Sequence, residues 1–319
     1  MKISVIGCGR WGSLITWYLD RVGHDVTLYG RANDPAMIRF LETRANDVVT
    51  FPESIKLTTD INDVPGGDAV LISIGCQGLR DLFDELRPLG IKDSTFILCM
   101  KGIEIETGKR LSEVTKECTD PSNKVAVWIG PGHVQEFYAG IPNCMVIDSD
   151  DSATKKHLVE EFSSDLIRFY YGEDLIGNEI GAAAKNVIGI AAGMLDGVGM
   201  STLKGPLMSR GTREVARLID ALGGKGISAY GLCHLGDYEA TVFSKYSHNR
   251  KFGETYVRGI TYNLLAEGYF TADALHRLAA KHNVDMPICE AVYNILYNGE
   301  PHMDALDKLF SRSLKKELH

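Results

Sequence analysis

The sequence predicts a doubly wound α/β fold in its first half and an all-helical second half. Two observations lead to this prediction. Apolar, strand-like runs alternate with helical stretches as far as about residue 175, and strand signals stop there. In addition, the first apolar run, Lys2–Ile6, leads directly into a G-x-G-x-x-G loop that extends from Gly7 to Gly12 and opens a helix.

The glycine loop predicts a dinucleotide-binding site. Gly7 permits a tight turn, Gly9 lets the backbone approach a pyrophosphate, and Gly12 lets the next helix pack on the strand. Arg10 and Trp11 begin that helix, whose N–H groups and positive dipole end favour a phosphate. A glycine-rich turn without a ligand is the alternative, but the order strand, loop, helix and second strand favours the nucleotide site.

Each element has its own local signal, namely an apolar run for a strand and a helical period for a helix. The expected strands are Lys2–Ile6, Asp25–Gly30, Ile55–Thr58, Ala69–Ile74, Thr95–Met100, Val125–Ile129, Cys144–Ile147 and Ile167–Tyr170. The expected helices include Arg10–Val22, Gly78–Leu86, Ala153–Phe162, Ala182–Met194, Pro206–Leu222, Thr271–Asn283, Pro287–Tyr297 and Met303–Leu314. We therefore expect a dinucleotide-binding Rossmann domain over residues 1–175 and a helical substrate and catalytic domain over residues 176–319.

Length and composition restrict the class of protein. With 319 residues, 45% of them hydrophobic and 24% charged, the chain has room for two ordinary globular domains. The net charge of −8 disfavours nucleic acid and anionic membranes as partners, and no apolar run is long enough to span a membrane. Met1 leads directly into the first strand, so we expect no signal peptide. Seven scattered cysteines without a C-x-x-C pair predict reduced thiols in the cytoplasm, and the histidines show no metal-ligand spacing.

The end of the second strand bears on the choice of nicotinamide cofactor. An NAD-selective site usually has an acidic residue there, which binds the ribose 2′-hydroxyl. This chain has Tyr29, Gly30 and Arg31 instead, and an arginine can pair with a 2′-phosphate. We therefore expect NADPH or NADH as the cofactor, with NADPH favoured. The alternative is that Arg31 is only a solvated surface residue.

Two lysines are candidates for the chemistry. Lys185 lies in the small and apolar run from Gly181 to Gly193, so a large molecule can approach it, and burial would lower its pKa into a range that suits proton transfer. The alternative is close helix packing, with Lys185 extending outward to solvent. Lys101 follows an apolar strand and precedes Gly102. It can hold a substrate oxygen, unless it is only a surface lysine at a strand end.

Two further segments carry polar groups. Asp237 and Thr241 are four residues apart, so a helix would turn both to one side, where the aspartate can orient a lysine or accept a substrate hydroxyl. The alternative is an N-cap aspartate after a glycine turn. The run Ser247–Gly253 combines hydroxyl, amide, guanidinium and ammonium groups, which suit a phosphate, although a solvated basic loop is the usual explanation.

Together these segments resemble the bacterial NAD(P)-dependent glycerol-3-phosphate dehydrogenase family, in the family order and along nearly the whole chain. The resemblance is carried by Gly7–Gly12, Tyr29-Gly30-Arg31, Gln77-Gly-Leu-Arg80, Lys101-Gly102-Ile-Glu104, Gly130-Pro131, Lys185-Asn186-Val187, Gly236-Asp237, Asn249-Arg250-Lys251-Phe252-Gly253, Ala266-Glu267-Gly268 and Asp285-Met-Pro-Ile-Cys-Glu290. The Lys-Asn-Val and Gly-Asp…Asn-Arg-x-Phe-Gly segments in this order are specific, whereas the glycine loop alone is not.

The resemblance implies a role for each candidate. Lys185 would exchange the proton of a 2-hydroxyl or 2-ketone, with Lys101 and Asp237 completing the catalytic group. The implied substrate residues are Lys101, Gly130, Gly132, Asn186, Thr241, Ser247, His248 and Asn249. The implied cofactor residues are Gly7, Gly9, Arg10, Trp11, Gly12, Arg31, Lys101, Val134, His248 and Glu267. The resemblance also implies a homodimer.

Three departures from the family pattern concern the site. Residues 247–249 read Ser-His-Asn where the family has Ser-Arg-Asn, so His248 replaces a phosphate-binding guanidinium. Residues 130–134 read Gly-Pro-Gly-His-Val where the family has Gly-Pro-Ser/Thr-Phe-Ala, and Gly132 removes a hydroxyl near the substrate. Residues 74–77 read Ile-Gly-Cys-Gln where the family has Val-Pro-Ser-Gln, so Gly75 replaces a proline.

These observations favour an NAD(P)H-dependent reductase that converts dihydroxyacetone phosphate to sn-glycerol 3-phosphate for glycerophospholipid synthesis. One alternative is a reductase of the same architecture that acts on another small 2-oxo compound. A second alternative, from another class, is a regulatory protein that binds NAD(P)H without turnover. The presence of Lys185, Lys101 and Asp237 argues against this regulatory protein, because a sensor needs no proton donor.

Overall fold

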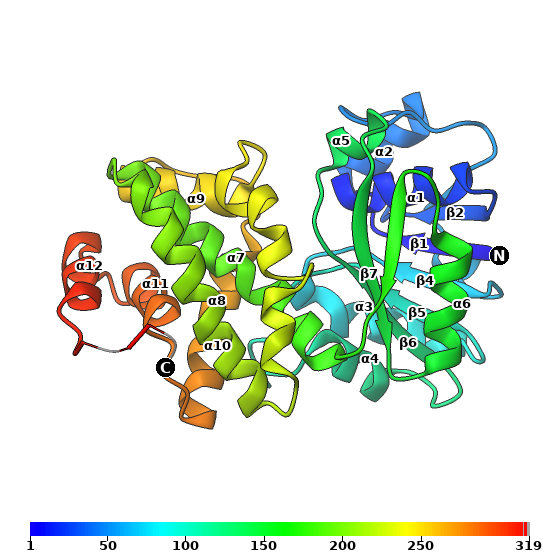
Figure 1. Cartoon of the computed structure of the whole chain (residues 1–319). Coiled ribbons are helices and arrows are strands. Elements are labelled where there is room, and N and C mark those ends of the chain that lie inside the picture. The colour runs from blue at the N-terminus through cyan, green and yellow to red at the C-terminus, as the bar shows by residue number, and fades with distance from the viewer. Residues whose placement is uncertain (315, 318–319) are drawn as a thin grey trace.

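A single eight-stranded sheet organises the first half of the chain in this computed structural model, which describes residues 1–314, 316 and 317 (Figure 1). The strand order is β3-β2-β1-β4-β5-β6-β7-β8, and all neighbours are parallel except the antiparallel pair β6 and β7. The strands are β1 Lys2–Ile6, β2 Asp25–Tyr29, β3 Lys56–Thr58, β4 Ala69–Ile72, β5 Thr95–Leu98, β6 Lys124–Ile129, β7 Asn143–Ser149 and β8 Ile167–Tyr171. All eight expected strands are confirmed, with ends that differ by at most two residues.

Helices cover both faces of this sheet because every central strand is apolar on both sides. Ile3 and Val5 of β1 pack under α1 and α2, and α5 and α6 cover the same face farther along. Ile6 of β1 faces the opposite way, toward α3 and α4. The helices are α1 Arg10–Arg21, α2 Pro35–Thr43, α3 Leu79–Leu86, α4 Leu111–Cys118, α5 Val134–Tyr138 and α6 Ser152–Phe162.

The sheet contains one point at which the strand order reverses. From β1 the chain goes to β2 on one side, and later returns to β4 on the other side. A ligand crevice forms at the carboxyl ends of the strands at such a point. The loop that begins at Gly7 follows β1 and the segment from Ser73 follows β4, so both border this crevice.

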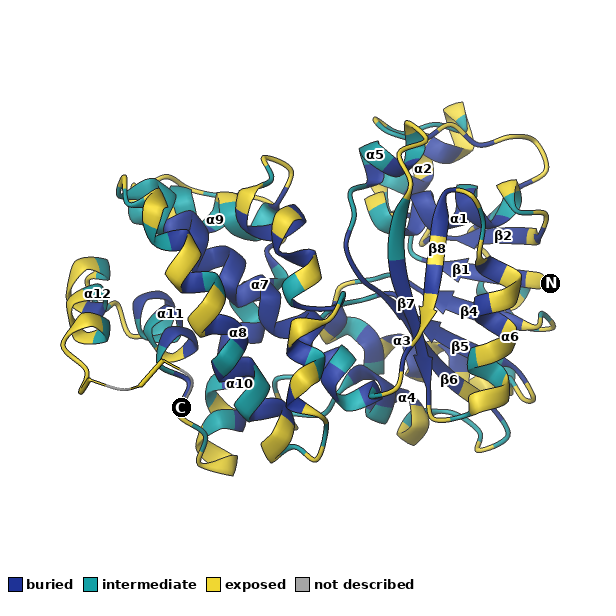
Figure 2. Cartoon of the chain, viewed as in Figure 1, coloured by how far each residue is buried: buried dark blue, intermediate teal, exposed yellow. Residues whose placement is uncertain are grey.

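The second half is helical and is built around one buried helix (Figure 2). This helix, α7, spans Leu175–Gly197, and it is buried almost continuously from Glu179 to Met194. The other helices are α8 Lys204–Ala221, α9 His248–Val257, α10 Glu267–His282, α11 Pro287–Tyr297 and α12 His302–Phe310. No helix in the described part of the chain is long and apolar enough to cross a membrane.

Small residues on α7 serve close packing against α9. A Cβ added at Gly193 would lie 1.8 Å from the backbone oxygen of Arg250, and one added at Gly189 would lie 2.7 Å from a methyl of Thr241. The small face therefore receives protein backbone, as the packing alternative predicted. That alternative was wrong about Lys185, however, because this side chain is buried rather than extended into solvent.

Three local expectations need correction. The helix expected over Ala182–Met194 is only the middle of α7, because the adjoining turns also pack in the core. The run Ser247–Gly253 is not a basic loop: Ser247 caps the N-terminus of α9 by accepting from the N–H of Arg250. The last helix, α12, ends at Phe310 rather than Leu314.

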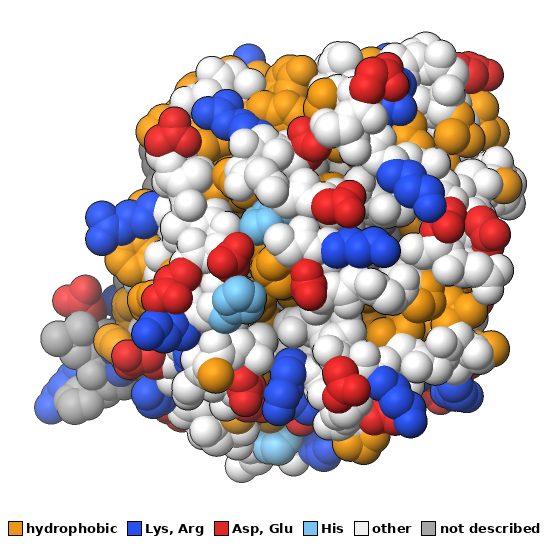
Figure 3. Space-filling model, turned by 90° about the vertical axis from the view of Figure 1, so that its right-hand side faces the viewer, with side chains coloured by type: hydrophobic (Ala, Val, Ile, Leu, Met, Phe, Trp, Pro, Cys, Tyr) orange, Lys and Arg blue, Asp and Glu red, His pale blue; other side chains and the backbone are white. Residues whose placement is uncertain are grey.

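The surface of the sheet half carries both signs of charge. Figure 3 shows lysines and arginines interspersed with aspartates and glutamates across the face that lies at the right of Figure 1. The fields of neighbouring charges of opposite sign offset each other, and dissolved salt screens what remains over longer distances. This face therefore carries no single-signed field of the kind that steers a highly charged partner.

Candidate active site

Two positions of the glycine loop, Gly7 and Gly12, accept only glycine. A Cβ at Gly12 would lie 1.9 Å from the backbone oxygen of Gly7, and Gly7 itself has a φ of +109°. Gly9 differs, because a Cβ there would meet no protein atom within 4 Å. A Cβ at Gly9 would therefore project into open space at the N-terminus of α1, whose first N–H groups have no partner within the helix.

A hollow of about 390 Å³ extends from this loop along the carboxyl ends of the strands. Its walls are Ile6, Gly7, Cys8, Tyr29, Gly30, Arg31, Asp34, Ile74, Gly75, Cys76, Gln77, Gly78, Asp81, Leu82, Leu265, Glu267 and Phe270. The glycine loop and this hollow fit a dinucleotide that lies across the reversal point of the sheet.

Arg31 lies at the rim of the hollow and pairs with Glu85 of α3. Its side chain is 59% exposed, so this ion pair contributes little stability and the guanidinium can exchange partners. Asp34 also lines the hollow, but its carboxylate caps α2 by accepting from the N–H of Ala36.

Glu267 connects the helical half to the loop after β4. Its carboxylate accepts from the N–H of Cys76 at 3.2 Å and from the Cys76 thiol at 2.8 Å. Burial raises the pKa of Glu267. Gly75 lies next to this contact, and a Cβ there would be in ordinary van der Waals contact with the carboxylate, at 3.6 Å. The departure at Gly75 and Cys76 thus forms part of the wall that holds Glu267.

Asp237 joins the two lysines that the sequence predicts to be catalytic. Its Oδ2 lies 2.7 Å from the Nζ of Lys101 and 2.7 Å from the Nζ of Lys185. Lys101 comes from the loop after β5 and also donates to the backbone oxygen of Gly130 at 2.6 Å. Lys185 comes from α7 and also donates to the Oγ1 of Thr241 at 2.8 Å. The structure therefore brings these predicted residues to one point between the two halves.

The electrostatics of this cluster leave Lys185 able to transfer a proton. Burial lowers the pKa of Lys185 to about 8, and the charge of Asp237 opposes this effect. An ammonium has three N–H groups, and contacts to Asp237 and Thr241 use two of them. Asp237 is only 1% exposed, and its Oδ1 has no hydrogen-bond partner among the described residues. Both groups thus have capacity for a ligand.

The backbone around Thr241 departs from the helix that the spacing predicted. Leu235–Asp237 is a 3₁₀ turn, and Glu239–Phe243 is a single π turn. Both side chains nevertheless reach Lys185, as expected. Single π turns are frequent at functional sites, because they re-aim side chains within a helical segment.

Two asparagines hold this cluster in place rather than extending into the crevice. Asn186 donates to the backbone oxygen of Lys101 at 3.1 Å and accepts from Asn249 at 3.0 Å. Asn249 in turn accepts from the N–H of Gly268 at 2.9 Å. The chain of bonds connects α7, α9 and α10 to the loop after β5, so these residues position Lys101.

His248 meets the glycine loop across the crevice. Its Nε2 lies 3.1 Å from Arg10 Nη1, and its Nδ1 lies 2.6 Å from the hydroxyl of Tyr262. Burial lowers the pKa of His248, and the charge of Arg10 lowers it further. Because a guanidinium only donates, Nε2 accepts from Arg10, and Nδ1–H therefore donates to Tyr262. Arg10 has no ion-pair partner within residues 1–314, 316 and 317, so its positive charge is available here.

The guanidinium in the Ser247–Gly253 run is used within the protein. Arg250 pairs with Asp196 and Glu254, so its charge is not free to bind a phosphate. The hydroxyl oxygen of Ser247 accepts a hydrogen bond from the backbone N–H of Arg250, so its O–H group can still donate to a ligand. Trp11 and Val134, expected beside the cofactor, are not among the residues that line the hollow. Val134 belongs to the hydrophobic core, and the ring of Trp11 packs on Phe137 next to it.

The segment from Gly130 to Val134 contributes a residue that the sequence analysis did not include. Gly132 has a φ of +137°, and a Cβ there would lie 2.2 Å from the ring of Phe137, which explains the glycine. The next residue, His133, has a buried Nε2 with no hydrogen-bond partner in the described structure. The signal available in the sequence was the imidazole itself, at a position where the family pattern has a phenylalanine.

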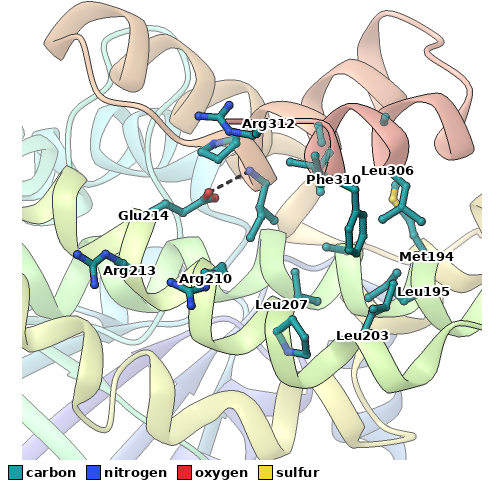
Figure 4. A pocket seen from close by; sticks show the side chains of 18 of the residues that line it. Met194, Leu195, Leu203, Leu207, Arg210, Arg213, Glu214, Leu306, Phe310 and Arg312 are labelled. Atoms are coloured by element: carbon teal, nitrogen blue, oxygen red, sulfur yellow. Dashed lines mark hydrogen bonds between the residues drawn. The ribbon is translucent and has the colours of Figure 1, made fainter. Parts of the chain in front are cut away.

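A second hollow, of about 530 Å³, lies away from this cluster in the helical half (Figure 4). Leu195 and Leu207 form its apolar floor, and Arg210 and Arg213 of α8 border it. Glu214 points to the start of α11, where it accepts from the backbone N–H groups of Ile288 and Cys289. None of the predicted site residues lines this hollow.

The fold and the crevice define a class of protein, a Rossmann-fold dehydrogenase, with a cluster of two lysines and an aspartate between the sheet half and the helical half. Among the described residues, no group of three or more His, Cys, Asp and Glu side chains could hold a metal.

Comparison with known sequences shows the family. The descriptions "NAD-dependent glycerol-3-phosphate dehydrogenase N-terminus" and "C-terminus" match residues 2–155 and 174–307. The chain therefore belongs to the NAD-dependent glycerol-3-phosphate dehydrogenase family. A glycerol-3-phosphate dehydrogenase [NAD(P)+] from Chlorobium phaeobacteroides (strain BS1) is 36% identical, covering 100% of this chain and 99% of that protein. One from Thermoanaerobacter sp. (strain X514) is 34% identical, with 100% and 99% covered.

Solved structures agree with this assignment. Glycerol-3-phosphate dehydrogenase from Coxiella burnetii superposes with a TM-score of 0.90 at 28% identity, covering 98% of this chain and 99% of that chain. A 2-dehydropantoate 2-reductase from Methylococcus capsulatus has a TM-score of 0.63 at 19% identity, covering 98% and 99%, and shares the fold.

The glycine loop yields a first prediction. Gly12→Ala should lower the free energy of unfolding by about 1–3 kcal/mol, because its Cβ has no room beside the Gly7 oxygen. Gly9→Ala should leave stability unchanged but weaken NADH binding about tenfold or more, because its methyl enters the crevice. Thermal melts and NADH fluorescence titrations measure the two effects. A stable Gly12→Ala protein, or unchanged NADH affinity in Gly9→Ala, would contradict this account of the glycine loop.

Proposed function

We propose that this chain is an NAD(P)H-dependent reductase that converts dihydroxyacetone phosphate to sn-glycerol 3-phosphate, reversibly, and so supplies glycerophospholipid synthesis. The observation that supports it best is the buried cluster of Lys101, Asp237 and Lys185 beside the dinucleotide crevice. The names of the relatives that match along the whole chain agree with this reaction.

The cluster provides the proton and the charge that ketone reduction needs. The nicotinamide, when bound, supplies the hydride that reaches the carbonyl carbon. Lys185 donates its remaining ammonium proton to the carbonyl oxygen, while Lys101 stabilises the negative charge that develops there. With both lysines protonated the cluster carries a net charge of +1, since Asp237 cancels one of the two. Thr241 and Asp237 keep the Lys185 ammonium fixed in direction.

A phosphate group fits the region around Arg10. The guanidinium there is unpaired within the described residues and lies against His248 at the start of α9. The positive end of α9 and the N–H groups of its first turn add to this field. We infer that Arg10 supplies the positive charge that the family pattern places at position 248, with Ser247 as a neutral donor and His248 holding the Arg10 guanidinium in place.

The test of the reaction is loss of NADPH absorbance with purified protein and dihydroxyacetone phosphate, beside NADH and a panel of non-phosphorylated 2-oxo acids. Rapid oxidation with only the phosphorylated ketone supports the proposal. Turnover restricted to a 2-oxo acid would identify a different reductase on the same scaffold. Binding of NADPH without turnover on any ketone would favour a regulatory protein.

Removal of the proton donor gives the second prediction. Lys185→Met keeps the length of the side chain but should lower kcat by about 10²- to 10⁴-fold, while the NADPH dissociation constant stays within about twofold. Stopped-flow turnover and fluorescence titration measure the two quantities. Lys156→Met, on the exposed face of α6, is the matched control and should change neither. Lost NADPH binding in Lys185→Met would assign Lys185 a structural role instead.

The pH dependence gives the third prediction. Ketone reduction needs the protonated lysine, so kcat/KM for reduction should fall as the pH rises through about 8, the pKa of Lys185. Oxidation of glycerol 3-phosphate needs the neutral lysine, so its kcat/KM should rise through the same pH. In Asp237→Asn both transitions should move to lower pH, because the charge that raises the pKa of Lys185 is gone. Transitions unmoved by Asp237→Asn would exclude Lys185 as the titrating group.

Cofactor preference gives the fourth prediction. We infer that NADPH is favoured because Arg31 can exchange Glu85 for a 2′-phosphate. Arg31→Ala should then raise the dissociation constant of NADPH by about 10- to 100-fold and that of NADH by less than about twofold. Glu85→Gln, which frees the guanidinium, should tighten NADPH relative to NADH. Equal effects on both cofactors would refute the 2′-phosphate role, and isothermal titration with each cofactor decides.

We also infer that the protein is a cytoplasmic homodimer with a Rossmann domain over residues 1–175 and a helical domain from residue 176. The last strand ends at Tyr171 and α7 begins at Leu175, which supports this division. The free thiols of all seven cysteines agree with a reducing compartment.

A further inference from the structure

The segment between β6 and α5 places an unused imidazole beside the catalytic cluster. His133 follows Gly130, whose backbone oxygen accepts from Lys101 at 2.6 Å. The backbone oxygen of His133 is used by the first turn of α5, and its ring packs edge-on against Tyr246 with a centroid distance of 5.4 Å. The ring is therefore held in one place, while its buried Nε2 has no protein partner in the described structure.

A second unused polar atom lies in the same site. Asp237 Oδ1 is buried and unpartnered in the part of the chain that the structure describes, although Oδ2 binds both lysines. Buried polar atoms almost always have a partner, because each one without a partner costs the desolvation of that group. The charges of Asp237, Lys185 and Lys101 all act on His133, and Lys101 binds the same segment at Gly130, so the two atoms lie in one site. Two such atoms point to a ligand group that pairs with both.

The chemistry of the two atoms selects that ligand group. A carboxylate oxygen only accepts, whereas a neutral imidazole can donate from Nε2. Burial lowers the pKa of His133, and Lys185, Lys101 and Arg10 oppose its protonation further, although Asp237 favours it. A neutral ring offers no charge to a phosphate. The carbonyl oxygen of the ketone already has a proton donor, because Lys185 is proposed to donate to it. A hydroxyl both donates and accepts, so it alone among the groups of the ketone satisfies Asp237 and His133 together.

We propose that His133 is a specificity residue: its Nε2–H donates a hydrogen bond to the terminal hydroxyl of dihydroxyacetone phosphate, and that hydroxyl donates to Asp237 Oδ1. This inference rests on the proposed function. In the family pattern a serine or threonine hydroxyl stands at position 132. Here the φ of +137° at Gly132 and the ring of Phe137 exclude such a side chain, and His133 supplies a donor in its place.

The test compares two ketones that differ only in this hydroxyl. Wild-type protein should reduce dihydroxyacetone phosphate with a higher kcat/KM than hydroxyacetone phosphate, which has a methyl group in place of the terminal hydroxymethyl. His133→Phe removes the donor but keeps a flat ring, and should lower kcat/KM for dihydroxyacetone phosphate about 5- to 10-fold, mainly through KM. Its kcat/KM for hydroxyacetone phosphate should stay within about twofold.

Further variants separate hydrogen bonding from shape. His133→Gln, which restores an N–H donor, should recover part of the preference for the hydroxylated ketone. His133→Leu is a second donor-free variant and should behave as His133→Phe does. His157→Gln, exposed on α6, is the control and should match wild type on both ketones. Thermal melts and NADPH titrations on every variant show that the fold and the cofactor site are intact.

The outcomes separate the two proposals. Equal losses on both ketones, or no loss on either, would overturn the role of His133 and leave the proposed function standing. Equal kcat/KM of the wild-type protein on the two ketones would overturn it without any variant. Failure of the wild-type protein to reduce either ketone would overturn the proposed function, and the His133 inference with it.

Discussion

The site depends on the two ion pairs that the carboxylate of Asp237 forms with lysines. One oxygen binds Lys101 from the sheet half and Lys185 from the helical half, so a single buried group joins the two parts of the molecule. Without it, two ammonium groups would face each other in a poorly hydrated site, where like charges repel strongly. The aspartate keeps both Nζ atoms 2.7 Å from one carboxylate oxygen, and two lysines with one aspartate leave a net positive charge at this point.

The scaffold around this carboxylate explains several unusual residues. Glycines on α7 allow α9 to approach within backbone contact, and that approach brings Asn249 to Asn186 and His248 to Arg10. The asparagine pair then holds the backbone of Lys101. Close helix packing, which costs conformational freedom in each glycine, thus fixes the positions of Lys101 and of the His248–Arg10 pair.

The departures from the family pattern have local causes in the structure. Cys76 binds the carboxylate of Glu267 through its N–H and its thiol, and Gly132 avoids the ring of Phe137. His248 is neutral and bound to Arg10, so the positive charge lies on the neighbouring residue rather than being lost. The substitution of histidine for arginine at position 248 therefore leaves a positive charge in the crevice, on Arg10.

Sequence reasoning determined the fold class, all eight strands, the dinucleotide loop and the lysines, because apolar periodicity and glycine spacing are local properties. It could not place α9 as a helix, since its cap and its Arg250–Glu254 pair look like a solvated basic run. It also did not single out His133, because the lack of a partner for its buried Nε2 depends on which groups surround the ring. Only the tertiary structure decided that Lys185 points inward, that Arg250 is engaged by Asp196, and that Asp237 binds both lysines. These facts depend on burial and on contacts between residues far apart in the chain, which a linear pattern does not contain.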